Sequence, residues 1–240
     1  MIDIHCHILY GLDDGSDNLE ESVRMAEIAV RSGVKAIVAT PHSNVPDSYQ
    51  NFWSRDISQR LTLLNQRLVQ DGIPLKIFPG SEIFASGNIT ELIKSKKLLT
   101  LNNSMYPLVE FDFFERSDTV YRQLEALVAE GYVPIVAHPE RYAFVQEDES
   151  SVYRMRNIGC LLQVNKGSLN GGFGRNAFHA SHAIISDELA DFVASDAHSP
   201  YMRTPFLEDA HEEVSIMTSF DYAELIFSKN PAKVVLNKKI

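Results

Sequence analysis

The sequence predicts a single α/β domain over residues 1–240, folded as a closed β/α barrel with parallel strands. Short β-branched segments alternate with longer segments of helical period along the whole chain. This alternation is typical of parallel strands that are joined by crossover helices. About seven such units follow one another without a break in composition or a long linker, which favours a closed barrel over an open sheet.

The predicted strands are short and apolar, and lie at residues 2–6, 35–40, 75–79, 106–111, 133–137, 161–164 and 192–194. Helical periodicity is clearest at residues 19–33, 51–72 and 118–131. Each of these three segments ends at a glycine, which commonly stands just past the end of a helix. The stretch "NGGFGRN" near residue 172 lacks the lysine and the spacing of a phosphate-binding P-loop, so it is predicted to be an ordinary loop.

Composition and charge limit the classes of partner. The net charge of −10 argues against a nucleic-acid partner, because phosphate backbones are bound by neutralising them with Lys and Arg. No apolar run approaches the length of a membrane span, and the amino terminus lacks the features of a signal peptide, so a cytoplasmic location is expected. Cys6 and Cys160 are therefore expected to be buried free thiols.

Imidazole and carboxylate side chains recur where the predicted strands end. The opening segment "IDIHCHILYGLDDG" places His5 and His7 on one face of a strand, while Cys6 between them points into the barrel wall. The late segment "VASDAH" repeats this spacing with Asp196 and His198. The full set of candidates is His5, His7, Asp14, His42, Glu82, Glu110, His138, Asp196 and His198.

Such a set favours a metal centre. In a parallel barrel the carboxyl ends of the strands converge on one rim, where nine polar and like-charged groups would be costly without cations. Carboxylates and imidazoles are the ligands of Mn, Fe and Zn. A single histidine or glutamate near a strand end more often has a structural role, so the prediction depends on the recurrence. His179, His182 and His211 do not lie at strand ends and are left out.

The motifs "HCH", "TPH", "GSE", "AHPER" and "SDAH", in this order, resemble those of the polymerase-and-histidinol-phosphatase (PHP) superfamily. Within it, "MIDIHCHILYGLDDGSDNLEES" and "PIVAHPERY" resemble the CpsB/CapC-type protein-tyrosine phosphatases of bacterial capsule and exopolysaccharide biosynthesis. The resemblance runs from Met1 to "NPAKVVLN". It implies a distorted (β/α)7 TIM-like barrel that carries three divalent metal ions on its carboxyl-terminal rim.

The resemblance also assigns residues to the three ions. Carried over position by position, the ligand sets are His5, His7, Glu82 and Asp196 for the first ion, Glu82, Glu110 and His138 for the second, and Asp14, His42 and His198 for the third. Arg141 resembles a phosphate-contacting arginine of the family, and Arg203 in "SPYMRTP" matches a second one more loosely, with an exposed solvated arginine as the alternative. Arg141, Arg203 and Asp196 are the residues expected to act in catalysis.

The implied activity is metal-assisted hydrolysis of phosphotyrosine on a cognate tyrosine kinase of the polysaccharide machinery. Asp14 and Glu110 stand where many members of the family carry histidines, and such hard ligands favour Mn²⁺, with Fe²⁺ or Co²⁺ as substitutes. A cysteine-dependent phosphatase is excluded because no C-x5-R loop exists. Aromatic residues in or near the predicted rim loops could contact the substrate ring, although each taken singly is more often ordinary packing; they are Tyr10, Phe84, Phe114, Tyr142 and Tyr201.

Three alternatives remain at this point. A histidinol phosphatase would share the metals and the reaction class but act on a small cationic substrate. A nuclease is opposed by the acidic net charge and by the absence of basic clusters. A catalytically silent module that only docks on a kinase is opposed by the intact set of candidate ligands.

Overall fold

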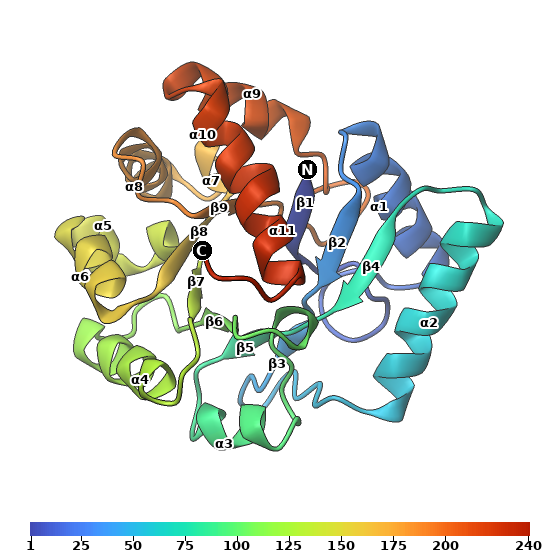
Figure 1. Ribbon diagram of the computed structural model, residues 1–240, viewed down its shortest axis with the longest axis horizontal. Coiled ribbons are helices and arrows are strands. Elements are labelled where there is room, and N and C mark those ends of the chain that lie inside the picture. Colours follow the sequence, from blue (N-terminus) through green and yellow to red (C-terminus); the bar gives the residue numbers. More distant parts are fainter.

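The computed structural model describes residues 1–240 and contains two parallel sheets inside a ring of helices (Figure 1). The first sheet has the order β1 (Ile2–Cys6), β2 (Ala36–Ala39), β4 (Lys76–Pro79). The second has the order β3 (His42–Ser43), β5 (Glu82–Phe84), β6 (Leu108–Glu110), β7 (Ile135–Ala137), β8 (Leu161–Asn165), β9 (Phe192–Ala194).

The two sheets together form a distorted barrel with seven strand positions. The chain passes from β2 to β3 through residues 40–41 and from β4 to β5 through residues 80–81, so each pair occupies one position. The ring closes next to β1, where the backbone N–H of Asp196 donates to the carbonyl of His5 at 2.8 Å. The N–H of His7 donates to the carbonyl of Ala197 at the same distance. The predicted (β/α)7 barrel is confirmed.

Strands β3 and β5 were not predicted. The second and third strands were predicted to end at residues 40 and 79, but after a short break the chain pairs again, and His42 and Glu82 lie in strands. Pro41 lacks the N–H that a continuous ladder needs. At Gly80 a Cβ atom would lie 2.7 Å from Cγ1 of Val38, so only glycine fits the close approach there.

The helices surround the strands in Figure 1. Their bounds are α1 Leu19–Arg31, α2 Arg55–Gln70, α3 Ile89–Lys94, α4 Ser117–Ala129, α5 Ala143–Glu147, α6 Ser150–Ile158, α7 Lys166–Leu169, α8 Arg175–Ser186, α9 Glu208–Met217, α10 Phe220–Glu224 and α11 Asn230–Val235, with short turns η1 Leu101–Asn103, η2 Pro139–Arg141 and η3 Leu225–Lys229. The side chain of Asn18 accepts a hydrogen bond from the N–H of Glu21 and caps α1. The predicted terminator Gly33 follows α1 with φ of +81°, a conformation that favours glycine.

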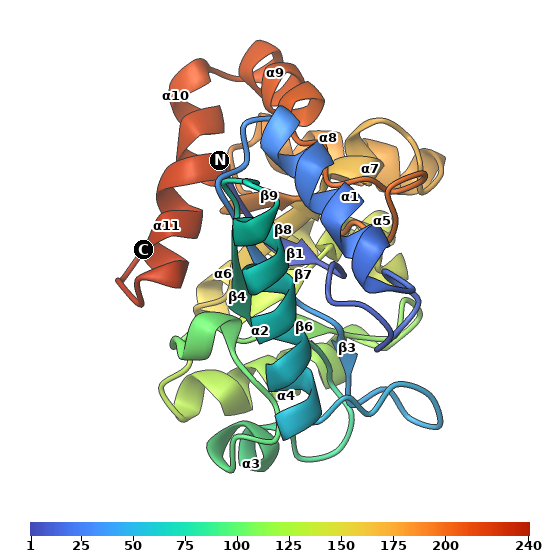
Figure 2. The same cartoon turned by 90° about the vertical axis from the view of Figure 1, so that its right-hand side faces the viewer.

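The apolar core has an inner and an outer part. The inner part fills the barrel with side chains such as Ile4, Val38, Leu108 and Phe192, and Val234 of α11 joins them. The outer part packs the opposite faces of the strands against the helices. Figure 2 shows α11 and both termini on one side of the molecule, so α11 covers the amino-terminal mouth and leaves the other mouth to the loops.

A β-bulge in β1 sets the direction of the opening histidines. Asp3 pairs with Ile37 and Cys6 with Ala39, so three steps along β1 match two steps along β2. Because of this extra residue, Ile4 belongs to the inner core while Cys6 belongs to the outer core. His5 and His7 thus face the rim together, as predicted, and Cys6 points into the wall.

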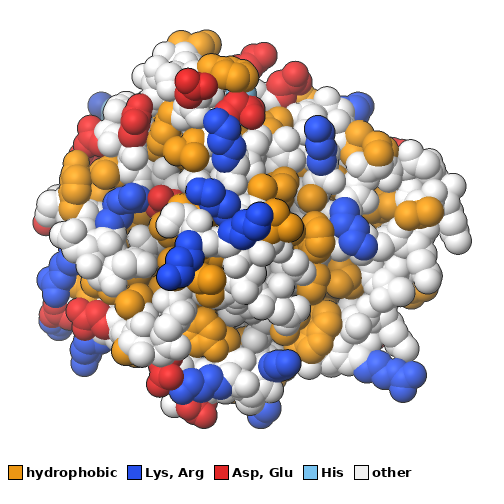
Figure 3. Space-filling model, viewed as in Figure 1, with side chains coloured by type: hydrophobic (Ala, Val, Ile, Leu, Met, Phe, Trp, Pro, Cys, Tyr) orange, Lys and Arg blue, Asp and Glu red, His pale blue; other side chains and the backbone are white.

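Both cysteines are free and buried, as expected. No helix combines the length and the apolar character that crossing a bilayer requires. On the face viewed in Figure 3, Lys and Arg side chains gather near the middle, over the carboxyl-terminal segment, and the predicted histidine cluster is not visible.

Candidate metal centre

The structure brings all nine predicted side chains together at the carboxyl ends of the strands. Most of them are buried, and only the side chain of Asp14, at 54% exposure, is widely open to solvent. The three histidines that were left out lie elsewhere: His179 accepts from Nε of Arg175, His182 pairs with Glu213, and His211 pairs with Glu224. The cluster therefore contains the histidines that were predicted at strand ends and none of the other three.

Glu82 lies at the centre and contacts four imidazoles. Its Oε1 lies 3.2 Å from Nε2 of His5 and 2.9 Å from Nε2 of His138. Its Oε2 lies 3.3 Å from Nε2 of His7 and 3.0 Å from Nδ1 of His42. A carboxylate shared in this way can bridge two neighbouring cations.

Asp196 connects the imidazoles to the two arginines. Its Oδ1 lies 3.5 Å from Nε2 of His5 and 3.4 Å from Nε2 of His7. Its Oδ2 lies 2.6 Å from Nη2 of Arg203 and 3.7 Å from Nη1 of Arg141. The arginine donors therefore stand directly beside the cluster, where an anionic substrate would meet them.

Asp14 completes the cluster on its open side. Its Oδ1 lies 3.6 Å from Nε2 of both His42 and His198. Ligand atoms within 4.8 Å of one another form three groups, which are His7, Asp14, His42 and His198; His5, His7 and Asp196; and His42, Glu82 and Glu110. The last group differs from the ligand set that the resemblance implied for the second ion, which was Glu82, Glu110 and His138. In the structure His42 takes the place of His138 in this group, because Nδ1 of His42 lies 3.2 Å from Oε2 of Glu110.

Two residues that were not predicted, Asp13 and Gln163, orient the histidines. Nδ1 of His7 lies 2.7 Å from Oδ2 of Asp13, and Nδ1 of His5 lies 2.8 Å from Oε1 of Gln163. If each Nδ1–H donates to its partner, each Nε2 keeps a free electron pair toward the cluster, which is the usual arrangement around metal-bound histidines. Asp13 also accepts from the backbone N–H of His42, at 2.8 Å. Two features of the sequence could have indicated these residues: the paired aspartates in "LDDG", and the polar Gln163 inside the apolar segment "LLQVN".

The metal-free site has strongly shifted pKa values. Burial opposes protonation of His42, but the carboxylates of Glu82 and Glu110 outweigh it and raise the pKa of His42 to about 10. Burial likewise opposes protonation of His7, yet Asp13 holds the pKa of His7 well above its usual value. Burial, together with the nearby His7, lowers the pKa of His198 to about 3. Without cations the site thus retains protons on some of its imidazoles.

Several buried polar atoms of the cluster make no hydrogen bond of acceptable geometry, although some of them lie close together, as Nδ1 of His42 does to Oε2 of Glu82 and of Glu110. They are Nδ1 of His42, Oε2 of Glu82, Oε2 of Glu110, Nδ1 of His138 and Nε2 of His198. Unsatisfied buried polar atoms are costly and rare in native proteins, and five of them at one place call for a ligand. Nitrogen and oxygen donors of this kind suit divalent transition metals, so the residues present fit metal ions.

Both arginines lie against aromatic rings. The guanidinium of Arg141 lies 4.2 Å from the ring centre of Phe113, which follows β6, and 4.2 Å from the ring centre of Phe173, which follows α7. Arg203 lies 5.2 Å from the ring centre of Phe173. Its side chain is 34% exposed and its Nη2 is paired with Asp196, so this guanidinium is not surrounded by solvent alone.

The aromatic residues named as candidates for the rim differ in their exposure to solvent. Tyr142 is fully buried; its hydroxyl donates to the carbonyl of Ala137 at 2.9 Å and accepts from the N–H of Phe111. Tyr142 therefore has a packing role, which was the favoured interpretation for each of these residues taken singly. Phe114 and Tyr201 are exposed, at 85% and 67%. A tyrosine that was not predicted, Tyr49, lies parallel to His42 with ring centres 5.9 Å apart.

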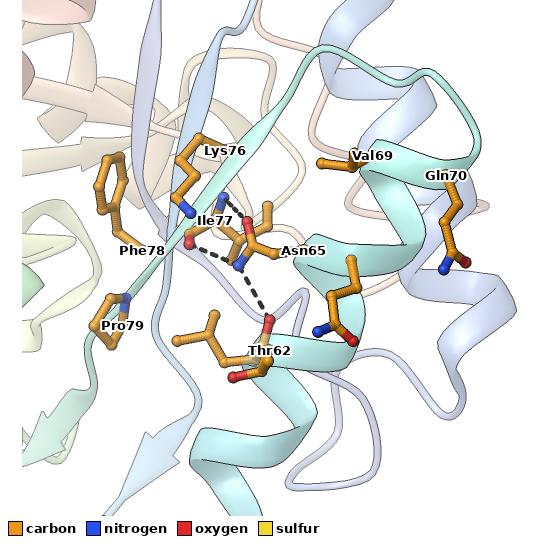
Figure 4. Close-up of a pocket in the computed structure, with 10 residues that line it drawn as sticks. Thr62, Asn65, Val69, Gln70, Lys76, Ile77, Phe78 and Pro79 are labelled. Carbon is orange, nitrogen blue, oxygen red and sulfur yellow. Dashed lines mark hydrogen bonds between the residues drawn. The ribbon is translucent and has the colours of Figure 1, made fainter.

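A groove of about 750 Å³ lies away from this cluster, between α2 and β4 (Figure 4). Asn65 reaches across it and hydrogen-bonds both backbone groups of Ile77, at 3.0 and 3.1 Å. The groove contains one charged side chain, Lys76, and no group of candidate ligands. This groove therefore offers no second candidate metal site.

Comparison with known proteins agrees with this geometry. Tyrosine-protein phosphatase YwqE of Bacillus subtilis is 39% identical over 88% of this chain and 82% of its own length. The putative tyrosine-protein phosphatase CapC of Staphylococcus aureus is 33% identical over 100% of this chain and 93% of its own length. A TatD family hydrolase from Entamoeba histolytica has a TM-score of 0.60 at 12% identity, which shows the fold alone.

A solved structure from the pair YwqE of Bacillus subtilis and CpsB of Streptococcus pneumoniae, described as metal-dependent tyrosine phosphatases, superposes with a TM-score of 0.92. It is 33% identical and covers 100% of this chain and 96% of the other. The family model for capsular polysaccharide synthesis, CpsB/CapC, matches residues 1–236. This chain belongs to the CpsB/CapC family.

Proposed function

We propose that this chain is a metal-dependent protein-tyrosine phosphatase that hydrolyses phosphotyrosine on a tyrosine kinase of the capsular or exopolysaccharide machinery. The observation that carries the proposal is the rim cluster, in which unsatisfied buried imidazole and carboxylate atoms adjoin two arginines. The names of the relatives, which are tyrosine-protein phosphatases, support the same activity.

The proposed cofactor is a set of three divalent ions, held by the nine clustered residues. Mn²⁺ is the proposed metal, with Fe²⁺ or Co²⁺ as substitutes, because the carboxylates of Asp14 and Glu110 are hard ligands. When bound, such ions lower the pKa of water and stabilise negative charge on a phosphoryl group. Asp13 and Gln163 would keep the imidazoles of His7 and His5 turned toward them.

The protein's own residues bind and orient the phosphate. Arg141 and Arg203 present guanidinium N–H donors beside the cluster, and such donors pair in fork geometry with phosphoryl oxygens. Asp196 pairs closely with Arg203, at 2.6 Å, and lies 3.7 Å from Nη1 of Arg141, so both guanidiniums stand at the edge of the site. A phenol has a pKa of about 10, so a tyrosine leaves as phenolate with little help from a general acid.

We expect a purified, metal-stripped sample to regain activity with Mn²⁺ and to prefer an aryl phosphate. At matched loading, Mn²⁺ should give a higher kcat than Zn²⁺, and kcat/KM for a phosphotyrosyl peptide should exceed that for histidinol phosphate by at least about 10-fold. The test is a steady-state assay of both substrates with each metal. Preference for histidinol phosphate would favour the small-molecule phosphatase, and higher turnover with zinc would refute the manganese assignment.

A variant of a predicted metal ligand tests the alternative that the chain only docks on a kinase and has no catalytic activity. His138→Asn should abolish turnover and leave the barrel folded, because the smaller polar side chain removes the contact with Glu82 but still fits beside the rings of Phe113 and Tyr142. If the wild-type protein binds a phosphorylated kinase tail but never hydrolyses it, the chain is a binding module.

Metal binding should strengthen as the pH rises. His42, with a pKa of about 10 in the metal-free site, must lose its proton before it can hold a metal, whereas His198, with a pKa of about 3, is already neutral. Between pH 6.5 and 9 the dissociation constant for Mn²⁺ should therefore fall, by up to about 10-fold per pH unit for each proton released. Calorimetry in buffers of different ionisation enthalpy would count the protons. A dissociation constant that does not change over this range would contradict the expectation.

A further inference from the structure

We propose that Phe173, in the glycine-rich segment "NGGFGRN", is a positioning residue that holds Arg141 and Arg203 ready for the phosphate of the substrate. The inference rests on the proposed phosphatase function. It adds a role for the loop that carries Phe173, which contributes no residue to the predicted metal and phosphate sites. Phe173 is the one aromatic residue whose ring lies near both guanidiniums, at 4.2 Å from Arg141 and 5.2 Å from Arg203.

A ring suits this role better than a polar group. Nη2 of Arg203 lies 2.6 Å from Oδ2 of Asp196, whereas Nη1 of Arg141 lies 3.7 Å from it, beyond hydrogen-bond distance. A further carboxylate in place of the ring would engage the N–H donors that the phosphate needs. The face of an aromatic ring attracts a cation without accepting its in-plane N–H groups. Phe173 therefore stabilises both positive charges while their donors stay available to an incoming anion.

The loop is built to place this ring. The N–H of Gly172 donates to the carbonyl of Gly167 at 2.8 Å, and the N–H of Gly171 donates to the carbonyl of Ser168 at 3.1 Å, so the loop folds back on α7. A Cβ atom at Gly167 would lie 2.6 Å from Cε2 of Phe173. Position 167 is thus open only to glycine if the ring is to stay where it is.

The same loop is tied to the turn that carries Arg141. Glu140, which precedes Arg141 and is fully buried, accepts hydrogen bonds through Oε1 from the hydroxyl of Ser168 at 2.6 Å and from the N–H of Asn165 at 3.0 Å. The ring and the guanidinium therefore belong to two segments that one buried carboxylate joins. Their stacking is a fixed feature of the fold and not a chance surface contact.

The experiment compares Phe173→Leu with the wild-type protein, both loaded with Mn²⁺, on a phosphotyrosyl peptide. We expect KM to rise about 10-fold, the size of a partly buried cation–π contact, with kcat within about 3-fold of wild type. The inhibition constant of inorganic phosphate should weaken by the same factor. Phenylglyoxal should label Arg141 and Arg203 faster in the metal-free variant, as peptide mass analysis would show, and Phe173→Trp should restore wild-type behaviour.

Two further variants sharpen the test. Phe178→Leu removes a half-buried ring from α8 that packs on His182 and contacts neither arginine, so its KM and labelling rates should match wild type. Gly167→Ala displaces the Phe173 ring without removing it and should raise KM in the same direction as Phe173→Leu.

Other outcomes would overturn the proposal. Unchanged KM, phosphate inhibition and labelling in Phe173→Leu would show that the ring does not position the arginines. Equal losses of kcat and metal content, with the same effect in Phe178→Leu, would show a structural role only. A wild-type protein that hydrolyses no phosphotyrosine would contradict the proposed function, and phosphate binding and labelling would then decide the role of Phe173 separately.

Discussion

Glu82→Gln is expected to reduce kcat/KM on aryl phosphates by at least about 10³-fold, because it removes the charge that organises the whole cluster. Glu82 contacts four imidazoles, and both of its oxygens take part. The amide keeps the shape of the side chain but replaces one acceptor oxygen with a donor NH₂ group. Bound metal per chain, measured by elemental analysis, should fall together with activity.

A matched exchange outside the site gives the control. Glu91 of α3 is exposed and pairs only with Lys94, so Glu91→Gln should keep full activity and metal content. A Glu82→Gln protein with wild-type metal content and turnover would remove Glu82 from the proposed metal centre, and with it the bridging role.

Asp13→Asn is expected to weaken metal binding by about 10- to 100-fold, as is usual when the carboxylate behind a metal-bound histidine is lost. Its carboxylate is fully buried, accepts from His7 and also holds the backbone of His42. The asparagine can still accept one hydrogen bond but no longer holds the charge that favours Nδ1–H on His7. Activity should therefore fall at limiting Mn²⁺ and recover in large part at saturating Mn²⁺.

The neighbouring Asp17 provides the comparison, since it lies on the same loop and is exposed. Asp17→Asn should leave the dissociation constant for Mn²⁺ unchanged. If Asp13→Asn binds Mn²⁺ as tightly as Asp17→Asn does, the orienting role of Asp13 is wrong.

The positions of the nine clustered residues could be predicted because each depends on one local fact, namely where its strand ends. Once parallel strands in a barrel are inferred, His138 and Asp196 must meet at one rim although they come from different units. No detail of packing is needed for that step. The break at Pro41 and Gly80, which creates β3 and β5, moves His42 and Glu82 into strands but leaves them on the same rim.

The residues that the sequence could not supply depend on contacts between distant segments. Gln163 supports His5 across 158 positions of sequence, and this pairing exists only because the barrel closes beside β1. Tyr142 was named as a candidate because it was predicted to lie in or near a rim loop. However, the turn begins at His138 with φ of +37° and directs the tyrosine ring into the core. Phe173 escaped notice because its glycine-rich surroundings indicate a loop and say nothing about what the loop touches.

The extra residue in β1 has a consequence for how this chain can vary. Before the bulge the strand contributes Ile4 to the interior, and after it the strand turns His5 and His7 to the mouth, so one short segment serves both packing and chemistry. Exchanging Ile4 for another aliphatic residue alters only how well the interior is filled. Shortening the segment by one position would rotate every later side chain by half a turn and send the thiol of Cys6, instead of the imidazoles, to the opening. The amino-terminal strand is thus more tolerant of altered side-chain volume than of altered length.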